Sequence, residues 1–131
     1  MKKLSLVISV YNEEAVLEKF YKAFCSIEQD LKYGGYELIF VNDGSIDASM
    51  RILESIAQQN KSVRVISFSR NFGHEAAMIA GIDYAVGGVI ICMDADLQHP
   101  LECITPIMEK FEEGYEIVSM VRTSNKSAGA I

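Results

Sequence analysis

Short apolar runs alternate with longer amphipathic segments along most of this chain, and this alternation limits the fold more than any other feature. Five runs have the length and β-branched content of buried strands: Leu4–Val10, Tyr36–Val41, Val63–Phe68, Val89–Met93 and Tyr115–Val121. The segments between them carry apolar residues at helical spacing: Ala15–Leu31, Ala48–Gln59, Glu75–Val86 and Leu101–Glu113. Strands that alternate with helices of this length predict βαβ units, and therefore an α/β fold with a mostly parallel sheet and helices on both faces.

Unusual polar residues gather in the segments that follow the predicted strands. In open parallel sheets, ligands bind beyond the carboxyl ends of the strands, so a site is expected there. The segments are Tyr11–Glu14, Asn42–Asp47, Ser69–His74 and Asp94–Pro100. Asp47, which ends the second of them, is a natural N-cap for the next helix.

Charge and cysteine content narrow the class of protein. The net charge of −6 argues against a general nucleic-acid binder, because phosphate backbones require clustered Lys and Arg. Cys25, Cys92 and Cys103 are odd in number and have no CxxC spacing. They therefore favour a reducing cytoplasm over a disulfide framework or a zinc site. Cys92 lies within an apolar run and is interpreted as a core residue.

The N-terminal apolar run is interpreted as a strand rather than as a signal peptide. It is short, and it meets Tyr11–Glu14 without a small-residue cleavage site. No apolar run approaches the ~20 residues that a membrane-spanning helix requires. We therefore expect the chain by itself to be soluble.

The most specific motif is Asp94-Ala95-Asp96-Leu97-Gln98-His99-Pro100, directly after a predicted buried strand. Two carboxylates two residues apart can share a hard cation that also holds a diphosphate, and Gln98 adds a further oxygen donor. Magnesium favours this arrangement, since it binds through one or two carboxylates and substrate phosphates. The alternative is an acidic loop in which an aspartate caps the following helix.

A second motif, Asn42-Asp43-Gly44-Ser45, also lies at a strand end. The Asp43 carboxylate could accept hydrogen bonds from a nucleobase or a ribose, and Gly44 allows close approach of the backbone. A turn followed by a helix cap explains the same residues equally well.

The first and third loops carry further candidates. Tyr11 could stack on a base while Glu13 bonds to its edge or to the sugar, although Asn12 could equally be a helix N-cap with acidic residues in the first turn. Arg70 offers a planar fork suited to phosphate or carboxylate. Phe72 is expected in the core, and His74 is interpreted as the start of a helix rather than as a base or a ligand.

Two other nucleotide-binding classes of α/β domain are excluded. A dinucleotide-binding Rossmann domain requires GxGxxG in the first loop, where this chain has Ser9-Val10-Tyr11-Asn12-Glu13-Glu14. The phosphate-binding P-loop, GxxxxGK[ST], is also absent from the sequence.

The motifs, in this order and spacing, resemble family 2 glycosyltransferases of the GT-A fold. Within that family, the runs Ser69–Gly73, Ala80-Gly81 and Asp94–Pro100 are similar to those of the polyprenyl-phosphate glycosyltransferases, which include dolichol-phosphate mannose synthases and bacterial undecaprenyl-phosphate enzymes. The resemblance covers about residues 4–122. It implies a GT-A nucleotide-sugar-binding domain over residues 1–122, and residues 123–131 as the start of an acceptor-side segment that is truncated here.

The resemblance also implies roles for particular residues. Tyr11, Glu13 and Asp43 would surround the base and ribose, Arg70 would lie near the phosphates, and Ser9 and Ser45 would complete the nucleotide-sugar site. Asp94 and Asp96 would be the catalytic residues that bind Mg²⁺ or Mn²⁺, assisted by Gln98. The sequence departs from the family pattern at Ser9, where proline is usual, and at Asn42, where an acid is frequent. We therefore leave Asn42 out of the site.

The implied reaction is an inverting transfer from a UDP- or GDP-sugar to a polyprenyl phosphate, at the cytoplasmic face of a membrane reached through segments absent here. The acceptor phosphate is already ionised at pH 7, so a strong general base is not obligatory. The uncovered sheet edge of a truncated domain predicts self-association as a homo-oligomer. Two alternatives remain open: a family 2 transferase with a saccharide or protein acceptor, and a non-catalytic nucleotide-sugar-binding module.

Overall fold

The computed structural model describes residues 3–28, 35–95, 104 and 116–119. Its helices and strands, in chain order, are β1 (Leu4–Val10), α1 (Leu17–Glu28), β2 (Tyr36–Asn42), α2 (Ser49–Gln59), β3 (Val63–Ser67), α3 (His74–Tyr84), β4 (Val89–Asp94) and β5 (Glu116–Ser119).

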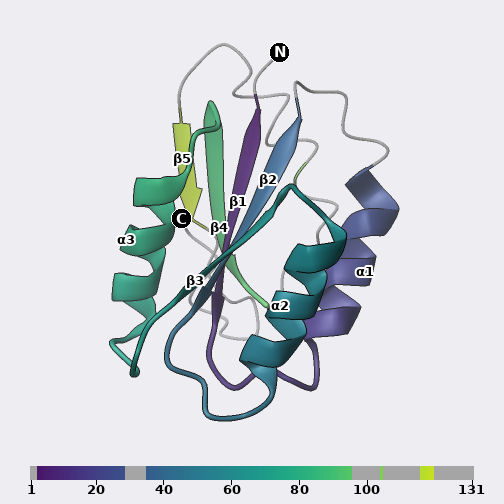
Figure 1. Ribbon diagram of the computed structural model, residues 1–131. Coiled ribbons are helices and arrows are strands. Elements are labelled where there is room, and N and C mark those ends of the chain that lie inside the picture. The colour runs from purple at the N-terminus through teal and green to yellow at the C-terminus, as the bar shows by residue number, and fades with distance from the viewer. Residues whose placement is uncertain (1–2, 29–34, 96–103, 105–115, 120–131) are drawn as a thin grey trace, which may run out of the picture.

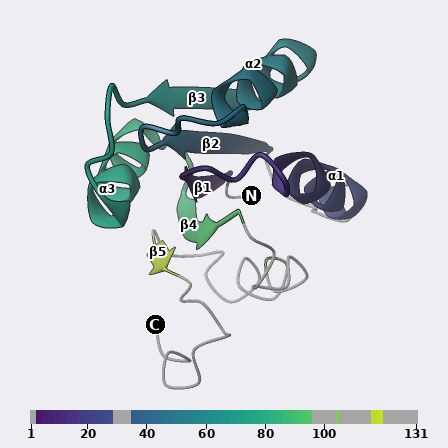
Figure 2. The same ribbon diagram turned by 90° about the horizontal axis from the view of Figure 1, so that it is seen from below.

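The strands form one parallel sheet in the order β3-β2-β1-β4-β5. Helices α1 and α2 lie on one face of the sheet and α3 lies on the other (Figures 1 and 2). The predicted α/β class, with a parallel sheet and helices on both faces, is therefore confirmed. Within the described residues, no helix is long and apolar enough to cross a bilayer.

Alternating residues of the buried strands build a core on each face. In β1, Leu6 and Ile8 pack toward α1 and α2, whereas Val7 packs toward α3. Cys92 belongs to the α3 side, as its apolar setting predicted, and burial raises the pKa of its thiol to about 11. Because the central strands are buried on both sides, Val89–Met93 of β4 is a continuous apolar run, and the only polar residues of β1 are Ser5 and Ser9.

The predicted strand boundaries are within a few residues of those observed. The helix predicted from Ala15 begins at Leu17, because the residues before it form a loop. The helix predicted over Leu101–Glu113 lies outside the described residues, apart from Ile104, which is buried in the core. Residues 123–131, predicted to begin an acceptor-side segment, also lie outside them.

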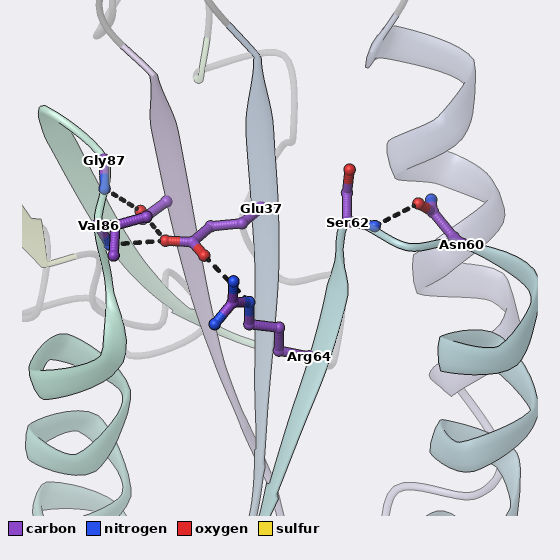
Figure 3. A network of polar contacts seen from close by, with 7 residues as sticks. Glu37, Asn60, Ser62, Arg64, Val86 and Gly87 are labelled. Atoms are coloured by element: carbon purple, nitrogen blue, oxygen red, sulfur yellow. Dashed lines mark hydrogen bonds and ion pairs between the residues drawn. The ribbon is translucent and has the colours of Figure 1, made fainter.

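A buried carboxylate ties together the amino ends of the central strands (Figure 3). Glu37, near the start of β2, is 2% exposed. Its Oε2 accepts hydrogen bonds from the Ser5 hydroxyl at 2.6 Å and from the Val86 N–H at 2.8 Å. Its Oε1 lies 3.6 Å from Nε of Arg64, and the Gly87 N–H donates to Ser5 at 2.8 Å. This network fixes the segment between α3 and β4 at the end of the sheet opposite the predicted site.

Candidate functional site

The predicted site loops meet at the carboxyl end of the sheet, around β1. The loops after β1, β2 and β3 are described completely, whereas only Asp94 and Ala95 of the loop after β4 are described. The chain leaves β1 toward β2 and β3 on one side, and β4 pairs with the other side of β1. The strand order therefore reverses between β1 and β4, where Ser9 is in register with Asp94. Such switch points are the usual ligand-binding crevices of open α/β sheets.

The loop after β1 is tied to the loop after β2 through Asn12. Its φ of 52° is positive, which asparagine tolerates better than most residues. Its Oδ1 accepts a hydrogen bond from the Ile46 N–H at 2.9 Å, and its own N–H donates to Oγ of Ser45 at 2.9 Å. Asn12 therefore joins two loops rather than capping α1, and Ser45 contributes to the same junction.

Asp47 and Glu14 extend this junction to the start of α2. Oδ1 of Asp47 accepts from the Ser49 N–H at 2.8 Å, and Oε1 of Glu14 accepts from the Ala48 N–H at 2.8 Å. Asp47 accepts a hydrogen bond at the start of α2, but the prediction that it is the N-cap is wrong by one residue, because α2 begins at Ser49 and Ala48 occupies the N-cap position. Partial burial would raise the pKa of Asp47, but hydrogen bonds from Ser49 and from nearby backbone N–H groups outweigh it and lower this pKa.

Asp43 is 2% exposed, and its carboxylate holds the loop before α3. It accepts hydrogen bonds from the Phe72 N–H at 2.7 Å, the Gly73 N–H at 3.0 Å and Nδ2 of Asn71 at 3.1 Å. A carboxylate buried this deeply requires such donors. The observed role of this carboxylate is structural, as the alternative interpretation of the motif allowed, but its partners lie in the loop before α3.

Gly44 allows a close approach of the backbone, as its residue type predicted, but the neighbour is the backbone of another loop of the protein. Its φ is +74°, and a Cβ built on it would lie 2.2 Å from the carbonyl carbon of Arg70 and 2.3 Å from the backbone nitrogen of Asn71. Only glycine fits here, because a side chain would collide with backbone rather than with a movable side chain. The loops after β2 and β3 thus touch directly.

Arg70 and Phe72 form an exposed pair at the rim of the site. The guanidinium carbon of Arg70 lies 4.1 Å from the ring centroid of Phe72, within the range of a cation–π contact. Phe72 is 50% exposed, so its expected place in the core is wrong. One edge of its ring packs on Phe68, with centroids 5.5 Å apart, while the rest lies on the surface.

His74 begins α3, as predicted, and it also contacts the first aspartate of the acidic motif. Its Nε2 lies 2.9 Å from Oδ1 of Asp94, and the two side chains are 57% and 18% exposed. Sequence reasoning missed this contact because the residues are separated by 20 positions and belong to different loops. The available signal was that both follow strands whose carboxyl ends meet at one edge of the sheet.

The remaining nucleotide candidates lie at the end of β1 and in the loop that follows it. Tyr11 is 46% exposed, so much of this residue is accessible to a ligand, whereas Ser9 is 8% exposed. The backbone N–H of Glu13 donates to Oγ of Ser49 at 2.9 Å, which fixes the loop that carries its side chain.

Asp94 suits a hard cation, since it places a partly exposed carboxylate at a strand end. Among residues 3–28, 35–95, 104 and 116–119, no three His, Cys, Asp or Glu side chains form a metal-binding group. The carboxylate oxygens of Asp94 are the type of ligand that Mg²⁺ takes together with the phosphates of a bound nucleotide. Asp96 and Gln98, the other predicted metal ligands, lie outside the described residues.

Comparison with known proteins identifies relatives over almost the whole chain. The model of the family "Glycosyl transferase family 2" matches residues 5–130. An uncharacterised glycosyltransferase of Bacillus subtilis is 48% identical over 122 residues, which cover 93% of this chain and 38% of that protein. A prophage bactoprenol glucosyl transferase homolog of Escherichia coli is 41% identical over 129 residues, which cover 98% of this chain and 42% of that protein. The chain thus spans about two fifths of the length of these relatives.

A solved structure shares the fold at low sequence identity. The mannosyltransferase from Pyrobaculum calidifontis, in complex with GDP-Man and Mn²⁺, superimposes with a TM-score of 0.63 at 17% identity. The match covers 72% of this chain and 28% of that protein. At this identity the similarity establishes the architecture alone.

Proposed function

The chain belongs to glycosyl transferase family 2, and we propose that it binds a nucleoside-diphosphate sugar for inverting transfer to a polyprenyl phosphate. The observation that carries this proposal is the position of Asp94, at the strand-order reversal between β1 and β4. Candidate base-binding residues follow β1, and a candidate phosphate-binding arginine follows β3, so the candidate donor-binding groups lie at the same edge of the sheet as Asp94.

Within this site, each group has a distinct proposed task. The exposed ring of Tyr11 stacks on the base, and Glu13 bonds to the base edge or ribose. Ser9 frames the base through its backbone, and Ser45 lines the same side. Asp43 shapes the nucleotide site by holding the loop before α3. The Arg70 guanidinium, already positioned on Phe72, binds the diphosphate.

We assign Asp94, Asp96 and Gln98 as the residues that hold Mg²⁺ or Mn²⁺ together with the diphosphate. A divalent cation bound there would stabilise the negative charge that develops on the departing nucleoside diphosphate. The Mn²⁺ and GDP-Man bound to the Pyrobaculum mannosyltransferase support this class of ligand. The Asp94 and Asp96 carboxylates orient the diphosphate and its metal ion, so that the anomeric carbon of the sugar is accessible to the acceptor.

The polyprenyl-phosphate acceptor is inferred from a relative of this chain. Its support is the 41% identity to a bactoprenol glucosyl transferase homolog over 98% of this chain. A phosphate acceptor carries its own negative charge at neutral pH, so this half of the site need not supply a strong base. We place the reaction at the cytoplasmic face of the membrane, where a polyprenyl phosphate meets a cytoplasmic sugar nucleotide.

Calorimetry of UDP and GDP binding, with Mn²⁺ or with chelator, tests the donor site. We expect Mn²⁺ to tighten binding to the parent protein, and Asp94→Asn or Asp96→Asn to lower this enhancement at least tenfold. Asp83→Asn, an exposed change on α3, is the matched control and should behave like the parent. Equal enhancement in the Asp94 and Asp96 variants and in the control would remove both aspartates from the metal site.

The acceptor is tested separately, by incubating the protein with polyprenyl phosphate, Mg²⁺ or Mn²⁺ and a panel of UDP- and GDP-sugars. Formation of a polyprenyl-phosphate sugar is expected of the full-length gene product, whereas the 131 residues by themselves are expected to bind nucleotide without transferring the sugar to lipid. Transfer to a free saccharide instead would replace the lipid acceptor. Tight nucleotide-sugar binding without turnover on either acceptor would favour a non-catalytic binding module.

A further inference from the structure

The geometry points to His74 as a positioning residue that holds the Asp94 carboxylate in the orientation in which it receives the metal–diphosphate. This inference rests on the proposed function, because it gives Asp94 the metal-binding role. It adds a residue that is not one of the proposed ligands and lies outside the acidic motif. The observation behind it is the 2.9 Å contact between Nε2 of His74 and Oδ1 of Asp94.

The position of His74 is determined by the backbone around it. Gly73, with a φ of 109°, directs the chain into α3, and its carbonyl accepts the helical hydrogen bond of Ala77 at 3.1 Å. The Gly73 N–H is bound in turn by the buried Asp43 carboxylate at 3.0 Å. The imidazole is therefore attached to a segment anchored at the end of β2, and it reaches across to the end of β4.

A carboxylate that binds a metal gains from such support. Asp94 stands at the last residue of β4, and its side-chain torsions have to be restricted before it can present an oxygen in one direction. A carboxylate has about four lone-pair positions on its two oxygens, so the same group can accept a hydrogen bond and bind a cation. Hydrogen bonds to ligating groups commonly set metal affinity in this way.

The exposed fractions of the His74 and Asp94 side chains indicate that His74 positions the carboxylate rather than packing in the core. His74 is 57% exposed and therefore contributes little to the core, whereas Asp94 is only 18% exposed. Loss of the imidazole should then leave the fold intact and remove one restraint on the carboxylate. A residue needed for packing would behave in the opposite way.

The test compares His74→Ala, His74→Gln and the parent by calorimetry with UDP and with GDP, each in Mn²⁺ and in chelator, together with thermal unfolding. We expect His74→Ala to lower the metal enhancement of nucleotide affinity about tenfold. Affinity in chelator should stay within twofold of the parent value. His74→Gln keeps a side-chain amide near the position of Nε2 and should recover most of the enhancement. Tyr84→Ala, 58% exposed on the same helix, is the control and should match the parent.

The outcomes separate this inference from the proposed function. If the parent shows no metal enhancement with either nucleotide, the proposed metal site fails and the inference falls with it. If the parent shows enhancement that His74→Ala retains, the inference alone is overturned. It is also overturned if His74→Ala loses affinity in chelator or unfolds well below the Tyr84→Ala control, or if His74→Gln recovers none of the loss, since His74 would then be a ligand or a structural residue.

Discussion

Asp43 lies in a loop that was predicted to bind a ligand, and its carboxylate binds residues of the neighbouring loop before α3. Its carboxylate is 2% exposed and receives hydrogen bonds from Asn71, Phe72 and Gly73. All three partners are donors, so both carboxylate oxygens are needed as acceptors. The residue type predicted a group that accepts hydrogen bonds, and this is confirmed. The protein donors that it binds could not be identified from the sequence.

Replacing Asp43 with asparagine should therefore destabilise the protein, although the two side chains have the same shape. In either orientation the new amide places an NH₂ group against a donor. We expect the free energy of unfolding to fall by about 2 kcal/mol, the cost of an unsatisfied buried group. Urea denaturation measures it, and the exposed Asp83→Asn change should cost no more than about 0.5 kcal/mol. Equal stabilities of the two variants would show that the Asp43 contacts contribute nothing.

At the scale of elements, α3 is placed by a close contact with the sheet. Gly81 is buried against β1, where an added Cβ would lie 2.3 Å from Cγ1 of Val7 and 3.3 Å from Cγ2 of Val41. This contact brings the helix axis near the strands, and it sets where the first residue of α3, His74, lies relative to β4. The packing of a helix thereby influences the geometry of the site at its end.

Gly81→Ala should lower stability even though alanine favours helices by about 1 kcal/mol over glycine. Val7 is β-branched and has little rotameric freedom, so the overlap forces either strain or a shift of α3. We expect a net loss of about 1–2 kcal/mol in urea unfolding. Asp83→Ala, exposed near the carboxyl end of the same helix, should be neutral or slightly stabilising. A more stable Gly81→Ala protein would mean that the contact relaxes without cost.

At the scale of the whole molecule, the two ends of the sheet have different tasks. The carboxyl end carries Asp94 and the loops that surround it. At the amino end, the Glu37 carboxylate joins β1, β2 and the segment before β4 (Figure 3). Because the two groups lie at opposite ends of the same strands, stability and ligand binding should be separable by mutation.

Two variants of Glu37 test this separation. Glu37→Ala leaves the Val86 N–H and the Ser5 hydroxyl without their acceptor, and should cost about 3 kcal/mol of unfolding free energy. Glu37→Gln retains one acceptor oxygen for these donors, but it replaces the ion pair with Arg64 by a buried NH₂ group, so its cost should be smaller than that of Glu37→Ala without vanishing. Nucleotide affinity, measured by calorimetry well below the unfolding temperature, should be unchanged in both. A parallel loss of affinity would show that the two ends are coupled.

The sequence by itself determined the order of helices and strands, the parallel α/β class and the loops that would carry the site. These depend on local periodicity: apolar runs that are buried on both faces, helical spacing between them, and polar residues at helix starts, such as Asp47. Such patterns involve residues close together in the chain, so they can be recognised before any tertiary contact is known.

Only the tertiary structure decided which loops touch. The position of β4 beside β1 brings His74 to Asp94 across 20 residues, and the pairing of β1 with β2 brings Asn12 to Ile46 across 34. The exposure of Phe72 and the requirement for glycine at position 44 also depend on how the loops after β2 and β3 pack against each other. These contacts join residues with no shared periodicity, and their free energy exists only once the strands have paired. The sequence could therefore place the polar residues at one edge of the sheet, but it could not show which of them would bind to one another.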